Sequence, residues 1–211
     1  MGLDRIFDES KDLASRLQNV LSVPRYDNTA QNRLSHLACS ISLEHAHATR
    51  ALLTDGLFPS SLVVLRAQFE ALVRAVWIFY AATDAQIEKL DATLAQDTEQ
   101  GAKNLPGNED MFVILDTKAP RAPVEALRRF RETSWKALNS FAHAGIHPLQ
   151  RHEHGYPFQI IEQCIKNSNG LAVIAAMHAA ILTGRQQLVA EVGRLQMIYC
   201  NCLPSIESDK G

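Results

Sequence analysis

Charged side chains interrupt an otherwise apolar segment at regular intervals. The only charged residues between positions 62 and 80 are Arg66, Glu70 and Arg74, and they follow one another at four-residue steps. On a helix this spacing places all three on one face, and burying them without partners is costly. The first interpretation is a structural ladder of Arg66, Glu70 and Arg74 that Glu44 or backbone carbonyls complete. The second is a polar pocket in which an arginine holds an anion.

A second polar face is expected on the segment that starts at Pro123. Glu132, Lys136, Asn139 and His143 recur at steps of three and four residues, so they share one side of a helix. His143 falls in the last turn, and histidine is the side chain best suited to exchange protons near neutral pH. Flanked by an amide and a cation, it could transfer protons at a phosphate. The alternative is a histidine that caps free carbonyls at the helix end.

A third set of polar residues lies closer to the N-terminus. His36, Ser40, Glu44 and His47 are nearly aligned at steps of three or four residues. Glu44 could pair with one of the arginines of the apolar segment, and His47 could join the same polar centre. We therefore expect this face to contribute to a site only if the three polar faces converge.

Four histidines fall within 12 residues, between His143 and His154, which raises the possibility of a metal site. The spacing of His143 and His147 suits two ligands on a helix, but Gly145 and Pro148 interrupt the helix there. No complete ligand set with a known spacing is present. We predict neither a metal nor another cofactor, and keep a metal-dependent hydrolase as an alternative.

The composition is that of an ordinary globular protein. The chain has 211 residues, of which 46% are hydrophobic and 21% charged, with a net charge of -2. A strongly basic surface is therefore absent, and any contact with nucleic acid must use a local patch. The short basic cluster at residues 127–131 is one such patch, although most clusters of this kind are solvated surface.

Three features predict a cytoplasmic protein that does not enter a membrane. The chain begins without an apolar leader segment. The apolar stretch at residues 62–82 is long enough to span a bilayer, but its central charges are expensive in lipid, so we predict a buried core helix. The four cysteines show neither a disulfide framework nor paired C-x-x-C spacing, which indicates reduced thiols.

Hydrophobic spacing predicts an all-α fold with a single domain over residues 1–211 and a core over about 30–202. No segment alternates with the period of a strand over more than a few residues. The pattern indicates a bundle of about seven helices, with irregular loops at 103–122 and 146–157 and a flexible tail at 203–211. The helical ranges are 3–22, 29–55, 59–82, 84–102, 123–144, 158–167, 170–183 and 185–202.

Three short segments together resemble the HEPN superfamily. They are His47-Ala-Thr-Arg-Ala-Leu-Leu, Leu65-Arg-Ala-Gln-Phe-Glu70 and Asn139-Ser-Phe-Ala-His143. The resemblance, to uncharacterised bacterial branches, covers roughly residues 30–200, but its specific part is a handful of positions. It implies a helical bundle that is often a homodimer. It also implies a metal-independent ribonuclease or an RNA-binding protein of a toxin–antitoxin or phage-defence system.

The family motif consists of an arginine, four to six intervening residues and a histidine. His143 matches the histidine, and Asn139 is a plausible polar partner. Six residues separate Lys136 from His143, so Lys136 stands where the family has its arginine. The resemblance therefore implies that Lys136 or Arg66 takes the role of this arginine. Lysine lacks the two-pronged guanidinium that suits a phosphate.

The first functional hypothesis is an RNA-directed protein with His143 as general acid or base and Asn139 as its orienting partner. Arg66, oriented by Glu70, and Lys136 would hold the phosphate, and His47, Arg74 and Glu44 would complete the binding site. The second hypothesis is a non-catalytic helical module that binds a small anionic ligand or a partner protein such as an antitoxin. A homodimer is also suggested by the alanine-rich apolar helix at 171–182.

Overall fold

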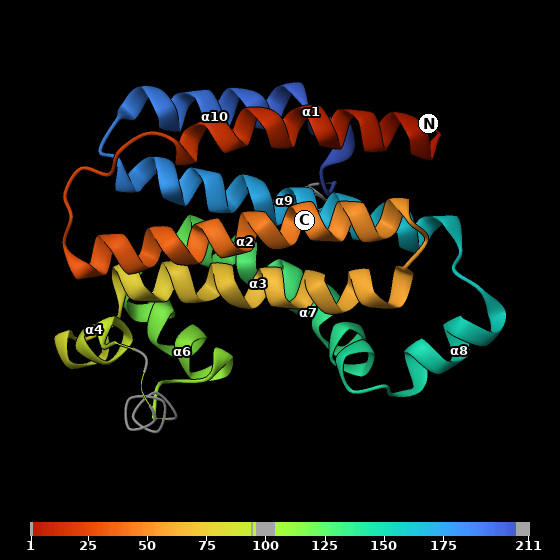
Figure 1. The fold of residues 1–211 in the computed structure, drawn as a ribbon, viewed down its shortest axis with the longest axis horizontal. Coiled ribbons are helices and arrows are strands. Elements are labelled where there is room, and N and C mark those ends of the chain that lie inside the picture. Colours follow the sequence, from red (N-terminus) through yellow and green to blue (C-terminus); the bar gives the residue numbers. More distant parts are fainter. Residues whose placement is uncertain (1, 94, 96–103, 206–211) are drawn as a thin grey trace, which may run out of the picture.

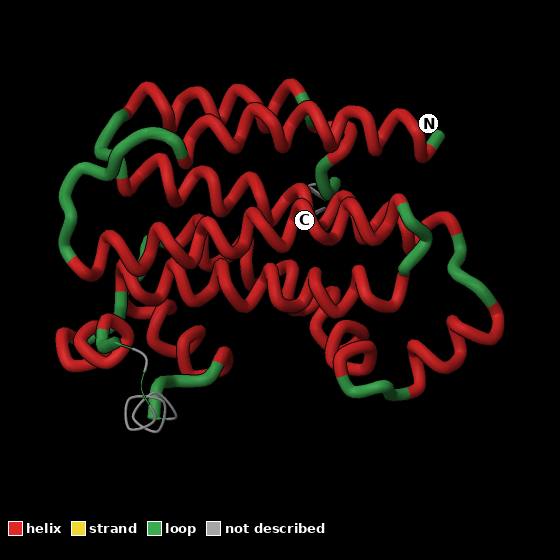
Figure 2. Tube along the Cα trace, in the orientation of Figure 1, coloured by secondary structure: helices red, strands yellow, loops and turns green. Residues whose placement is uncertain are grey.

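The computed structural model describes residues 2–93, 95 and 104–205. Within these ranges the chain forms α-helices, one short 3-10 helix and no strand (Figures 1 and 2), which confirms the predicted all-α class. Nine α-helices are described, where about seven were predicted. Their bounds are α1 (Leu3–Leu21), α2 (Ala30–Thr54), α3 (Phe58–Tyr80), α4 (Asp84–Asp91), α6 (Asn108–Lys118), α7 (Arg121–Ala142), α8 (Ile146–His154), α9 (Phe158–Leu182) and α10 (Gln186–Ile198), followed by the 3-10 helix η1 (Cys200–Cys202).

Three long helices, α2, α3 and α9, form the centre of the bundle. Figure 1 shows α1 and α10 side by side along one edge, followed by α9 and then by the antiparallel pair α2 and α3. Helices α6 and α7 pack on the far side of α3, and α8 extends from the end of α7. The centre of the fold is therefore covered on one side by α1 and α10 and on the other by α6 and α7.

Helix α3 is the predicted core helix. Phe69, Leu72, Val73 and Trp77 have no exposed surface, and full burial of each such side chain contributes roughly 1.5–3 kcal/mol. In the part of the chain that the structure describes, no helix is both long enough and apolar enough to cross a membrane. The apolar length of α3 therefore serves packing between α2, α6, α7 and α9.

Two buried polar ties join the three central helices. The hydroxyl of Ser35 donates to the carbonyl oxygen of Ala75 at 2.8 Å and lies 3.0 Å from Nε2 of His178, which assigns the imidazole proton to Nε2. Gln68 donates to the carbonyl of Ser168 at 2.8 Å and accepts from its hydroxyl at 2.7 Å. The four side chains that make these bonds are buried. Because the side chains in both sets of hydrogen bonds have partners, these bonds fix the register of α2, α3 and α9.

Helix α9 runs unbroken through residues 167–170, where a break between two helices was predicted. The prediction was wrong because these polar and small residues contact other parts of the fold. Asn169 donates to the hydroxyl of Ser10 on α1 at 2.7 Å. Gly170 lies against Pro204, and a Cβ at this position would lie 2.9 Å from the Cγ of that ring. The residue types that favour turns are used here for close helix packing.

Both segments predicted as irregular loops, 103–122 and 146–157, contain a helix. Helix α6 occupies the first and buries Met111 and Phe112 against α3. Helix α8 occupies the second, and its Pro148 lies in the first turn, where proline removes no intrahelical hydrogen bond. The prolines that suggested loops therefore mark helix starts.

The helix predicted at 84–102 is shorter in the structure. Helix α4 follows Thr83, as expected, and the Gln86 side chain accepts from the Thr83 backbone N–H at 2.9 Å. It ends at Asp91. Residues 96–103 lie outside the described part of the chain.

The core extends beyond the predicted range of 30–202 at both ends. Ile6, Leu13 and Leu17 of α1 are buried in the same core as the central helices. Leu203 was assigned to a flexible tail but retains only 7% exposure and packs in that core. Residues 206–211 of the tail lie outside the described ranges.

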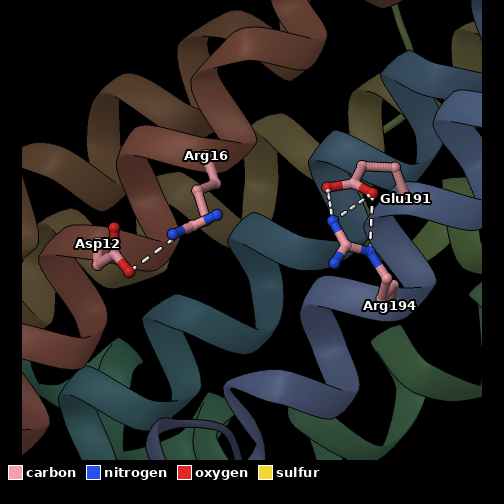
Figure 3. Close-up of polar contacts among 4 residues, drawn as sticks. All are labelled: Asp12, Arg16, Glu191 and Arg194. Carbon is pink, nitrogen blue, oxygen red and sulfur yellow. Dashed lines mark hydrogen bonds and ion pairs between the residues drawn. The ribbon is translucent and has the colours of Figure 1, made fainter.

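Surface ion pairs occur where α1 and α10 meet. Figure 3 shows Arg16 beside Asp12 on α1, and Glu191 beside Arg194 on α10. The hydroxyl of Tyr199 donates to Asp12, and together with the positive charge of Arg16 this lowers the pKa of the carboxyl group. Because all of these charges lie in water, we assign this network a small effect on stability.

Candidate functional site

A cluster of charged and aromatic side chains joins α3 to α7. Arg66 donates from Nε to Oε1 of Glu70 at 3.0 Å, and its Nη1 lies 3.4 Å from Nε2 of His143. The guanidinium carbon lies 5.0 Å from the ring centre of Trp135. We call these four residues the arginine–histidine cluster. It brings together three residues that the sequence singled out, although Arg66 and His143 are 77 positions apart.

Aromatic packing beneath the cluster fixes α7 on α3. The ring centre of Phe69 lies 4.8 Å from that of Phe130 and 5.7 Å from that of Trp135. The Trp135 ring therefore contacts both the buried Phe69 and the guanidinium of Arg66. A cation held over an aromatic ring gains about 0.5–2 kcal/mol, so this contact restricts where the guanidinium can point.

A tight turn holds His143 at the end of α7. Its backbone N–H donates to the carbonyl of Asn139 at 3.1 Å, so His143 is the C-cap of the helix. The N–H of Gly145 then donates to the carbonyl of Ser140 at 2.7 Å, and a Cβ at position 145 would lie 2.6 Å from Oγ of Ser140. That hydroxyl also accepts from the N–H of His147 at 3.1 Å. Glycine is therefore needed at 145, and the exposed His143 remains beside α3.

The guanidinium of Arg66 faces the imidazole of His143 as a hydrogen-bond donor. A guanidinium only donates hydrogen bonds, so in a hydrogen bond with Arg66 the Nε2 atom of His143 can only be the acceptor. The 3.4 Å separation is long for such a bond, so a stronger acceptor can replace the imidazole. The Arg66 and Glu70 side chains keep 20% and 42% of their surface exposed. An oxyanion can therefore reach Arg66 from solvent while Nε2 stays beside it.

Two polar atoms beside the cluster lack partners within the described ranges. The Nη1 atom of Arg74, one turn beyond Glu70, is buried without an acceptor, while its guanidinium lies 5.6 Å from the ring centre of Trp77. Burial lowers the pKa of Arg74, and the charge of Glu70 opposes this. The Oδ1 atom of Asn139 is also buried without a donor. The predicted ladder is therefore half formed, because Glu70 bonds to Arg66 alone.

Glu44 and His47 do not join the arginine–histidine cluster, so the condition that the three polar faces converge is not met. Both line a separate hollow between α1, α2 and α9, where Nδ1 of His47 lies 3.5 Å from Nη2 of Arg50. The reason is the rotation of α2. Ser42 faces α3 and donates to the carbonyl of Gln68 at 3.0 Å, and Glu44 sits roughly 200° around the helix axis from Ser42.

Trp135 belongs to the cluster although it was not predicted as a site residue, and Lys136, which was predicted, does not. Lys136 is exposed and makes no hydrogen bond or ion pair with the residues that the structure describes. Trp135, Asn139 and His143 follow one another at four-residue steps, and this spacing could have identified the tryptophan. The face chosen from the sequence began instead at Glu132, which is exposed.

The basic cluster at 127–131 is largely neutralised by α6. Arg128 pairs with Asp116, and Arg131 pairs with Glu109. Because the segment containing α6 was predicted as an irregular loop, its carboxylates were not considered as partners. These two arginines attach α6 to α7, and their charges are already satisfied by carboxylates rather than free for a phosphate.

The histidines between His143 and His154 do not converge. Those at 147, 152 and 154 lie on α8, and Nδ1 of His154 lies 3.1 Å from the carbonyl of Gln150. Among residues 2–93, 95 and 104–205, no three His, Cys, Asp or Glu side chains are grouped so as to hold a metal ion. The alternative of a metal-dependent hydrolase thus lacks a ligand set in the described chain.

Comparison with known proteins identifies one family. The family described as "Family of unknown function (DUF6988)" matches residues 39–205, which include all four residues of the arginine–histidine cluster. Neither a curated protein nor a solved structure matches the chain. The resemblance to the HEPN superfamily stays a prediction.

Proposed function

The chain belongs to the DUF6988 family, whose function is unknown, and we propose that its arginine–histidine cluster binds RNA and cleaves it without a metal ion. One observation carries the proposal. The guanidinium of Arg66, which always bears a positive charge, contacts the imidazole of His143 at a surface that solvent reaches. A group that can bind a phosphate therefore lies next to a group that can accept a proton.

The proposed reaction uses the ribose 2′-hydroxyl of the RNA as nucleophile. Nε2 of His143 accepts the proton of this hydroxyl as its oxygen bonds to the adjacent phosphorus. Arg66 donates to the non-bridging phosphate oxygens, where negative charge increases in the transition state. The bond to the 5′-oxygen breaks, and that oxygen takes a proton from water. The products are a 2′,3′-cyclic phosphate and a 5′-hydroxyl end.

The remaining residues of the cluster position Arg66. Glu70 accepts from Nε, which leaves the terminal nitrogens for a phosphate. Trp135 holds the guanidinium plane from below. Asn139, one turn before His143, accepts the backbone N–H of His143 at its carbonyl oxygen and so positions the histidine at the end of α7. On the basis of the HEPN resemblance, we also propose that the protein forms a homodimer, binds an antitoxin or another protein partner, and lies in the bacterial cytoplasm.

A cleavage assay in chelator tests the proposal. Purified protein is incubated with a single-stranded RNA and with the same oligonucleotide made of deoxynucleotides. We expect cleavage of the RNA alone, because the deoxy strand lacks the nucleophile. His143→Ala should lose activity by about 100-fold or more, and His154→Ala, an exposed histidine on α8, serves as the matched control.

The outcomes separate the two hypotheses. Equal cleavage by the wild-type protein and His143→Ala, or no cleavage of any RNA, contradicts catalysis by the cluster. RNA binding that Arg66→Gln weakens, without any turnover, favours the non-catalytic module instead. Loss of both binding and cleavage in His154→Ala would move the site away from the cluster.

A further inference from the structure

The hollow between α1, α2 and α9 lies on the opposite side of α2 from the arginine–histidine cluster. Helices α1 and α2 both pack on α9 but touch each other little (Figure 1), and the space between them has a volume of about 500 Å³. Apolar residues from all three helices line its floor, namely Leu17, Leu43, Ala46 and Ala172. Small-molecule sites in proteins are of this size, about 300–1,000 Å³, and commonly have such a floor.

The polar residues of this hollow are sorted by charge along its length. Helices α1 and α2 run in opposite directions (Figure 1), so Lys11 lies at the same end as Arg50, and Gln18 lies at the same end as Ser40. One end therefore carries two fixed positive charges, and the other carries neutral hydrogen-bonding groups. Glu44 lines the middle. From Ser40 to Arg50 the helix rises about 15 Å.

Arg50 lacks a carboxylate partner in the described part of the chain. Among the described residues, its side chain has one hydrogen bond, the 3.5 Å contact with Nδ1 of His47. The arginine is half-buried, and this burial lowers its pKa with no acid to offset the cost. A partly desolvated guanidinium gains most from an external oxyanion, which it can bind with two parallel hydrogen bonds.

The hollow between α6 and α7 provides an internal contrast. It has a similar volume, about 450 Å³, and two arginines also line it. There, Arg128 pairs with Asp116 and Arg121 pairs with Glu125. The cations of that hollow are neutralised by the protein itself, whereas those of the hollow between α1 and α2 are not.

We propose that the hollow between α1 and α2 binds a small organic phosphate of about the size of a mononucleotide. The phosphate group lies at the end formed by Lys11 and Arg50. Two positive charges match the two negative charges of a phosphate monoester better than the single charge of a carboxylate. The organic part lies over the apolar floor and reaches Glu44 and Ser40, which accept hydrogen bonds from sugar hydroxyls or a base amino group. The proposal does not depend on RNA cleavage.

Calorimetric titration of the full chain tests this binding. The probes are AMP, UMP and ribose 5-phosphate, each compared with its dephosphorylated counterpart. We expect at least one phosphate to bind with one site per chain, and its counterpart to bind at least about tenfold more weakly, which corresponds to about 1.4 kcal/mol. Equal binding of the paired probes, or no binding of any phosphate, overturns the proposal.

Three variants locate the binding. Arg50→Gln and Lys11→Ala should each weaken binding of the phosphate by about tenfold or more. Ser15→Trp places a large ring over the hollow from an exposed position on α1, so it should block binding without disturbing the core. His143→Ala should bind like the wild type. Loss of binding in His143→Ala alone would place the phosphate at the arginine–histidine cluster and contradict the proposal.

Discussion

Helix α3 carries polar residues on two sides, and the two sides differ in how completely they are bonded. Gln68, on the inner side, is fully buried and exchanges two hydrogen bonds with Ser168. On the outer side Arg66 bonds to Glu70 and, loosely, to His143, while Arg74 has a buried nitrogen with no acceptor in the described chain. Most buried polar groups in proteins have hydrogen-bond partners, and the loosely bonded, partly exposed Arg66 is the group of α3 that we assign to a ligand.

Lowering the pH should destabilise the contacts on the inner side of α3 first, through the buried His178 of α9. Burial lowers the pKa of this histidine to about 4, whereas the unfolded chain has the ordinary value of 6.5. Between these two values the unfolded state binds a proton that the folded state does not, so stability falls as the pH falls. The loss amounts to about 3 kcal/mol between pH 6.5 and pH 4. Denaturant unfolding at a series of pH values measures it.

The matched variants for this experiment are His178→Asn and His154→Ala. The first should flatten the pH dependence of the unfolding free energy between pH 6.5 and pH 4.5. The second removes an exposed histidine and should leave the slope unchanged. A slope that survives in His178→Asn would mean that another group carries the acid sensitivity.

Breaking one inner tie should cost less, about 2 kcal/mol. Gln68→Leu keeps the shape of the side chain but leaves the buried hydroxyl of Ser168 without its acceptor. The matched change on the outer side is Glu70→Gln, which we expect to shift the unfolding free energy by less than about 0.5 kcal/mol because this side chain is partly solvated. Chemical denaturation compares the two. Equal losses would remove the distinction between the sides.

The smallest effect concerns two helical glycines, one packed against Pro204 and one with open space beside it. A Cβ added at Gly193 in α10 would meet no heavy atom within 4 Å, so Gly193→Ala should stabilise the protein by about 0.5–1 kcal/mol. Gly170→Ala should give no such gain, because the new methyl group meets the ring of Pro204. Melting temperatures measured side by side provide the comparison, and a gain at 170 would show that α9 and Pro204 are loosely packed.

Patterns local to one helix were predictable from the sequence. The periodicity of α1, α2, α3 and α7 placed their bounds within a few residues, and the four-residue spacing of Arg66 and Glu70 predicted their ion pair. Turn-forming residues misled at Gly170 and Pro148. A glycine chosen for close packing, or a proline in a first turn, has the same sequence signal as a loop.

The grouping of residues from different helices was only partly predictable. His143 reaches Arg66 as expected, but Glu44 and His47 turn toward α1, because the rotation of α2 depends on which polar residue faces α3. That residue is Ser42, whose hydrogen bond to Gln68 is a tertiary contact with no local signature. A single sequence gives the faces of each helix but leaves open which faces meet.

The most direct test of the arginine–histidine cluster is a double-mutant cycle on the rate of RNA cleavage at saturating enzyme. If Arg66 and His143 act on the same phosphate, Arg66→Gln and His143→Ala each lower the rate by about 100-fold or more, and the double variant is no more than about threefold slower than the slower single variant. Unfolding free energies should stay within about 1 kcal/mol of the wild type. Losses that multiply, or single variants as fast as the wild type, would contradict a shared catalytic site.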